Sequence, residues 1–154
     1  MNEALAQDLY LKYPKIFKNE YSSEGYTGLD IGDGWYDIVD ALCGCIQHRI
    51  DLKNCTGKYD THKKFRSPEE LANPIPQVCV EQVKEKFASL RFYYSGGDEA
   101  IRGMVDLAEA ITSCVCETCG SPGKRTSGGW IRTLCRRHAE EQGREFMTDE
   151  AEDP

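Results

Sequence analysis

The sequence has no long hydrophobic run. No stretch of its 154 residues approaches the roughly 20 apolar residues that a membrane-spanning helix requires. The first residues, MNEALAQDLYLKY, do not contain the apolar core of a secretory signal. We therefore expect no membrane association and a cytoplasmic protein in a reducing environment.

Familiar catalytic motifs are also missing. The sequence has three histidines, no G-x-S-x-G motif, and no glycine-rich phosphate loop with its lysine. It shares paired cysteines with HNH-type nucleases but does not have their histidine-rich catalytic core. We expect no enzymatic activity, and no small-molecule substrate is evident.

Basic charge is scarce and unevenly placed. The 19 Lys and Arg residues stand against 26 Asp and Glu residues, for a net charge of −7. Residues 114–138 have a net charge of +4, whereas residues 1–113 have −5 and residues 139–154 have −6. The acidity of the whole chain disfavours tight non-specific DNA binding, but the local basic segment keeps nucleic-acid binding open.

Two closely spaced pairs of metal-ligand residues lie in this basic segment. Two residues separate Cys116 from Cys119, and two more separate Cys135 from His138. Three thiolates and one imidazole make a full tetrahedral set for Zn²⁺ with no open position. The intervening 15 residues, 120–134, suit a zinc ribbon or a short treble-clef loop. The spacing predicts a structural zinc ion in a ribbon over residues 114–139.

The other five cysteines are an odd number, which argues against a disulfide framework. Cys43 falls beside the apolar stripe of a predicted helix, where a free cysteine is commonly buried as a small hydrophobic residue. The alternative is a second metal site that joins Cys43 or Cys45 to His48, Cys55 or His62. Residues two apart on a helix face different ways, so Cys43 and Cys45 are a poor ligand pair.

Hydrophobic periodicity predicts the remaining elements. Spacing of three and four residues predicts an N-terminal helix and amphipathic helices over 35–52 and 98–113, the last with Asp98 as its cap. Alternating residues over 77–94 predict a hairpin that turns at Ala88-Ser89. Ser67 is predicted to cap a short helix through a capping box with Glu70.

These elements predict an α+β fold. We expect a small antiparallel hairpin or sheet packed by the two amphipathic helices, with the C-terminal zinc ribbon docked at one end. The α+β body would span residues 1–113 and the ribbon 114–139. Residues 140–154 are acidic and poor in apolar side chains, so we expect a disordered tail there.

The ordered combination KEKFASLRFYYSGGDE, CETCGSPG and GWIRTLCRRH resembles a family of small proteins from tailed phages and prophages. The upstream stretch GDGWYDIVDALC fits the same pattern, so the resemblance covers residues 32–138. It implies a phage accessory protein with a zinc ribbon, and it implies no activity. The family pattern has Gly where this chain has Ala88.

Two non-catalytic functions are compatible with these features. The first is an accessory factor that binds a host protein in the host cytoplasm, of the host-takeover or anti-defence type, whose acidic segments would meet a basic surface. The second is nucleic-acid binding through the ribbon, with basic residues on phosphate and an aromatic residue for stacking. The simpler interpretation of that basic set is that it screens thiolate charge. The candidate contacts are Lys124, Arg125, Trp130, Arg132, Arg136 and Arg137.

Overall fold

The fold is mixed α and β, as predicted. The computed structural model describes residues 1–17 and 28–147. Its first part contains α1 (Glu3–Lys12), β1 (Leu29–Asp30), the 3-10 turn η1 (Asp33–Trp35), the long helix α2 (Tyr36–Asn54), η2 (Gly57–Phe65) and α3 (Pro68–Ala72). The sheet and the second long helix follow as β2 (Cys79–Lys86), β3 (Ser89–Ser95) and α4 (Glu99–Thr112). The chain then continues with β4 (Lys124–Thr126), β5 (Arg132–Leu134) and α5 (Arg136–Glu141).

A three-stranded sheet with the order β1-β2-β3 forms the centre of the body. Strands β2 and β3 make the predicted antiparallel hairpin, and β1 adds a short parallel strand that the sequence patterns do not predict. The hairpin turns at Phe87-Ala88, one residue before the predicted position. Both residues have positive φ (53° and 64°), as a two-residue type I′ turn requires. Ala88 thus occupies a backbone conformation that favours glycine.

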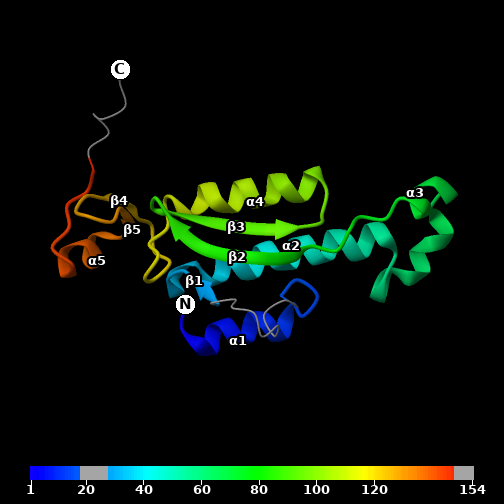
Figure 1. Cartoon of the computed structure of the whole chain (residues 1–154), viewed down its shortest axis with the longest axis horizontal. Coiled ribbons are helices and arrows are strands. Elements are labelled where there is room, and N and C mark those ends of the chain that lie inside the picture. Colours follow the sequence, from blue (N-terminus) through cyan, green and yellow to red (C-terminus); the bar gives the residue numbers. More distant parts are fainter. Residues whose placement is uncertain (18–27, 148–154) are drawn as a thin grey trace, which may run out of the picture.

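The two predicted amphipathic helices, α2 and α4, cover the sheet. Helix α4 packs against β3 and against α2, and α1 lies along the other side of α2 (Figure 1). Trp35, Ile46 and Leu90 are fully buried in the common core. Large apolar residues at helical spacing therefore fill the space between the helices and the sheet, as their periodicity predicts.

Both predicted helix caps are confirmed. The Asp98 side chain accepts a hydrogen bond from the Ile101 backbone N–H at 3.1 Å, and Ser67 and Glu70 form the reciprocal capping box. Asp98 also accepts a hydrogen bond from the Arg49 guanidinium at 2.6 Å, which ties the start of α4 to α2. The Arg49 contact is the main cause that lowers the pKa of Asp98.

A second, smaller core lies at one end of the molecule, opposite α3 (Figure 1). It contains Cys116, Leu134 and Ala139, with Phe146 packed against them. Residues 140–147 belong to this module, although we predicted a disordered tail from residue 140. The Ser127 and Met147 N–H groups bond to the Glu145 and Arg125 carbonyls at 2.8 and 2.9 Å. Residues 148–154 of the predicted tail lie outside the described residues.

A buried hydroxyl links α4 to the hairpin, and its removal is expected to destabilise the body. The Leu90 backbone N–H donates to Thr112 Oγ1 at 2.9 Å in a buried position. Thr112→Val would keep the shape but leave this N–H unpaired, at a cost of about 1–3 kcal/mol in the free energy of unfolding. Urea denaturation measures the loss, with Thr61→Val at an exposed position as the matched control. Equal effects of the two substitutions would contradict the assigned role of the hydroxyl.

Candidate metal centre and helix groove

The structure brings the four predicted ligands together. One ligand atom from each of Cys116, Cys119, Cys135 and His138 lies within 4.8 Å of the other three. The Cys119 and Cys135 sulfurs are 3.8 Å apart, and His138 Nδ1 lies 3.4 Å from the Cys116 sulfur and 3.3 Å from the Cys135 sulfur. The cluster can therefore hold a metal ion through three thiolates and one imidazole nitrogen.

Each ligand pair sits on a local turn. The Gly120 N–H donates to the Cys116 carbonyl at 2.9 Å, and Gly120 has φ +76°, which closes the first turn over the two cysteines. The second pair begins α5, with Cys135 as the extended N-cap residue and His138 in the first turn of the helix. Two residues between ligands thus suffice to direct both side chains of a pair to one point.

The environment affects the two thiols of the first turn in opposite directions. Hydrogen bonds from Ser121, first from its hydroxyl and then from its N–H, lower the pKa of Cys119 to about 6 and favour the thiolate. Burial raises the pKa of Cys116. A bound cation would favour the thiolate at both positions, since the thiolate is the ligand form of cysteine.

The histidine presents one ring nitrogen to the sulfurs and the other to a different environment. His138 Nδ1 faces the cysteines, while Nε2 lies 3.8 Å from Glu141 Oε2 and 3.2 Å from the Arg137 guanidinium. A carboxylate near the outer nitrogen is a common arrangement for a ligating histidine, because it fixes the ring orientation. The geometry assigns Nδ1 as the ligand atom.

The 3-10 turn η1, which precedes α2, lies directly on the first ligand turn. The Gly34 N–H donates to the Glu117 carbonyl at 2.9 Å, and the Trp35 indole N–H donates to the Val115 carbonyl at 2.8 Å. A Cβ on Gly34 would lie 2.3 Å from the Cys116 carbonyl oxygen and 2.6 Å from the Cys119 nitrogen. The body thus contacts the backbone of the candidate metal ligands themselves, and only glycine allows this approach.

Glu117 is a buried charge within this interface, with 5% of its surface exposed. The Arg132 guanidinium donates to one Glu117 carboxylate oxygen through two nitrogens and to Gln142 Oε1 at 2.9 Å. The other carboxylate oxygen has no hydrogen-bond partner among the described residues. Arg132, a predicted phosphate contact, is therefore engaged inside the module.

Of the other predicted nucleic-acid contacts, three interact with residues of the chain and two are free among the described residues. Arg125 donates to the Phe87 carbonyl at 3.5 Å, Arg137 lies 3.9 Å from Glu141, and the exposed Trp130 donates its indole N–H to Glu85. Within the described residues, the exposed side chains of Lys124 and Arg136 make no hydrogen bond or ion pair. They line a shallow hollow of about 240 Å³ beside Cys135 and Phe146.

Loss of the Arg132 side chain is expected to destabilise the C-terminal module. Arg132→Gln would leave the buried Glu117 carboxylate without its cation, which costs about 3 kcal/mol. Arg136→Gln is the matched control, because Arg136 is an exposed arginine of the same module. Thermal unfolding should show a lower Tm for Arg132→Gln only. A phosphate-binding role for both residues predicts instead unchanged stability and equal loss of nucleic-acid affinity.

The alternative second metal site does not form in the part of the chain that the structure describes. Cys43 is buried in the core, as the more ordinary interpretation predicts, while Cys45 is exposed. His48 Nδ1 is 2.9 Å from the Tyr59 hydroxyl, and the His62 ring packs edge-on to Tyr59. Cys116, Cys119, Cys135 and His138 form the one group of at least three potential ligands among these residues.

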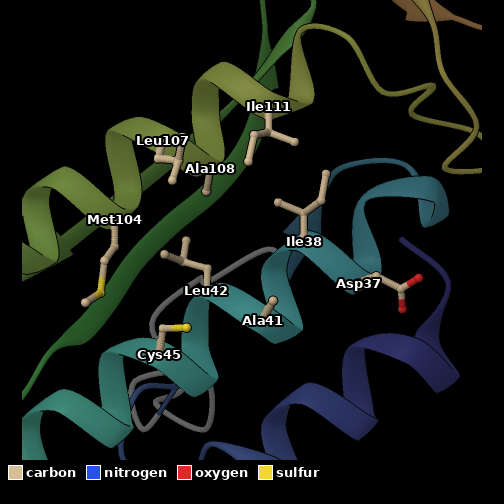
Figure 2. A pocket seen from close by; sticks show the side chains of 9 residues that line it. All are labelled: Asp37, Ile38, Ala41, Leu42, Cys45, Met104, Leu107, Ala108 and Ile111. Carbon is tan, nitrogen blue, oxygen red and sulfur yellow. The ribbon is translucent and has the colours of Figure 1, made fainter.

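An apolar groove between α2 and α4 is a second candidate site. Figure 2 shows Leu42 and Ala108 between the two helices, Ile38 near Ile111 at one end, and Cys45 toward Met104 at the other. The groove has a volume of about 330 Å³. Leu107 on its rim is 62% exposed and Ile111 is 40% exposed, so the apolar surface is open to solvent. Apolar periodicity did not predict this site, because the whole apolar stripe of each helix was expected to lie in the core.

Comparisons with known protein families, with curated proteins and with solved structures each found no match. Within residues 1–17 and 28–147, the helices do not combine the length and hydropathy that crossing a membrane requires. The cysteine–histidine cluster and the helix groove are therefore the candidate functional features of this chain.

Proposed function

We propose that the cluster binds one structural Zn²⁺. Tetrahedral bonds of about 2.3 Å to sulfur and about 2.0–2.1 Å to nitrogen place ligand atoms roughly 3.8 Å apart for two sulfurs and 3.6 Å apart for sulfur and nitrogen. The Cys119–Cys135, Cys116–His138 and Cys135–His138 distances of 3.8, 3.4 and 3.3 Å are close to these values, and all six ligand-atom pairs lie within 4.8 Å. Cys116, Cys119, Cys135 and His138 would fill all four positions, so the ion would hold the module together and leave no site for a substrate.

We further propose that the protein is a non-catalytic phage accessory protein that binds a host protein, of the host-takeover or anti-defence type. The apolar groove between α2 and α4 carries this proposal. A concave, mostly apolar pocket of about 330 Å³ is a typical form of a binding site. Three of the predicted nucleic-acid contacts, Arg125, Trp130 and Arg132, make contacts within the chain that favour a structural role for them.

Nucleic-acid binding through the C-terminal module is the second candidate. It is supported by Lys124 and Arg136, the two exposed basic residues beside the hollow. Two free cations supply far less affinity than a full set of phosphate contacts, and the chain has a net charge of −7. We therefore rank protein binding first.

A pull-down of the full chain from host lysate, with and without nuclease, separates the two functions. We expect a stoichiometric protein partner to remain bound after nuclease treatment. The double substitution Lys124→Gln and Arg136→Gln should leave this partner bound as well. Recovery of nucleic acid alone, lost with rising salt and with these two substitutions, would overturn protein binding in favour of the second candidate. Metal analysis of the same sample should give one zinc per chain.

A further inference from the structure

The groove has the dimensions of a helix-binding site. Its α2 wall runs from Asp37 to Cys45 and its α4 wall from Met104 to Ile111. At about 1.5 Å per residue, nine residues of α2 span roughly 12 Å, or a little more than two helical turns. An occupant of this length would present anchors at positions i, i+3 or i+4, and i+7.

The walls themselves repeat at helical spacing. Ile38, Ala41 and Cys45 form one ridge on α2, and Met104, Leu107 and Ile111 form the facing ridge on α4. The two ridges leave a channel whose floor is Leu42 and Ala108, as Figure 2 shows. A third helix packs its own ridge into such a channel more readily than an extended strand does, because no sheet edge is offered there.

The two helix stretches that line the groove are acidic. The stretches 37–45 and 104–111 contain four carboxylates and no Lys or Arg. Asp37 lines the groove directly. Asp40 is paired with Lys12 at 3.5 Å and Glu109 with Arg91 at 3.4 Å, whereas Asp37 and Asp106 are exposed and make no ion pair among the described residues. A partner that covers this surface is therefore favoured if its apolar stripe is flanked by lysine or arginine.

We propose that the groove is the docking site for a basic amphipathic helix of the partner protein. The inference depends on the proposed protein-binding function and specifies the partner's chemistry. A second copy of this chain is the poorer occupant, because a two-fold contact would place the same acidic surfaces against each other. The apolar stripe supplies affinity, and the flanking basic residues supply orientation and salt dependence.

Synthetic peptides test the groove directly on the full, zinc-loaded chain. The first probe is a peptide of about 15 residues with leucines at i, i+3, i+7 and i+10 and lysines beside them. The second has glutamates in place of the lysines, and the third keeps the composition of the first but scrambles the leucine spacing. We expect fluorescence anisotropy to show binding of the first, with the other two at least about tenfold weaker.

Two leucine variants locate the binding surface. Leu107→Gln removes an exposed apolar wall residue, and Leu11→Gln removes a leucine of α1 that is 71% exposed and lies outside the groove lining. We expect Leu107→Gln to weaken the lysine peptide about tenfold or more and Leu11→Gln to leave its affinity unchanged. Unfolding curves of both variants should match the parent chain, since neither side chain is buried.

The outcomes separate this inference from the proposed function. Undetectable binding of the lysine peptide, equal affinity for the lysine and glutamate peptides, or insensitivity to Leu107→Gln would overturn the basic-helix site. A concentration-dependent dimer that Leu107→Gln dissociates would assign the groove to a second copy. If a host protein stays bound after nuclease treatment and also binds the Leu107→Gln variant, the groove is not its binding site. The proposed protein-binding function would still hold. Recovery of nucleic acid alone would overturn protein binding itself.

Discussion

Cys116→Ser is expected to abolish the bound zinc and unfold the C-terminal module while the body remains folded. Structural zinc contributes apparent binding free energies of roughly 10–16 kcal/mol in small zinc modules, far more than the few buried residues of the second core can replace. The body has its own larger core of residues from the helices and the sheet. Metal analysis should fall from one zinc to none, and proteolysis should remove the segment after residue 113.

Cys114→Ser is the matched control for this prediction. Cys114 lies two residues before Cys116, but its exposed thiol contacts the Ile111 carbonyl and is outside the ligand cluster. The control should keep one zinc per chain and the proteolytic stability of the parent. Full zinc content in Cys116→Ser, or equal loss in both variants, would contradict the assigned ligand set.

Gly34→Ala is expected to separate the module from the body. The added Cβ would lie 2.3 Å from the Cys116 oxygen and 2.4 Å from the Gly120 nitrogen, and both are backbone atoms of the ligand turn. These atoms cannot move away without distorting the metal site, so we expect a loss of about 3 kcal/mol in the free energy of unfolding. The zinc should also be removed by EDTA more rapidly than from the parent chain.

Gly103→Ala is the control for Gly34→Ala, and we expect it to raise stability where Gly34→Ala lowers it. Gly103 lies within α4, and a Cβ there would meet nothing within 4 Å. Alanine at an open helical position should stabilise the body by about 0.5–1 kcal/mol. A Gly34→Ala protein as stable as the parent, with unchanged zinc release, would show that the loop does not support the metal centre.

The helices, the hairpin and the ligand cluster were predictable because each depends on residues that are close in sequence. The cysteine and histidine pairs need only a turn of four residues to point their ligands together. Helices α2 and α4 follow from apolar spacing, and the caps at Ser67 and Asp98 follow from local hydrogen bonds. The two cap hydrogen bonds join residues three apart, so they need no tertiary contact.

The role of Arg132 was not predictable in the same way. Its sequence neighbours suggest a phosphate contact, but its partner Glu117 is reached only after β5 lies beside the ligand turn. One signal was available, because Glu117 is the single acidic residue in the basic segment 114–138. A lone carboxylate among basic residues often marks an internal ion pair.

The contact of Gly34 with the ligand turn and the added strand β1 also depend on distant residues. The residues near Gly34 in the sequence do not indicate that the Cys116 carbonyl, more than 80 residues later, packs where a Cβ of residue 34 would lie. β1 is two residues long and pairs in parallel with β2, so it has no alternating pattern of its own. The groove was missed for a related reason, since periodicity shows that a helix face is apolar but not whether the fold covers it.

The hydrogen bond between Trp35 and Val115 joins residues 80 positions apart. During synthesis on the ribosome, the tryptophan emerges well before the second ligand pair, at residues 135 and 138, is translated. We expect the helices and the hairpin to collapse first around an uncovered glycine loop, because domains generally fold from the N-terminal side as the chain emerges. The segment with Cys116, Cys119, Cys135 and His138 would then fold last, against the surface that η1 already forms on the body.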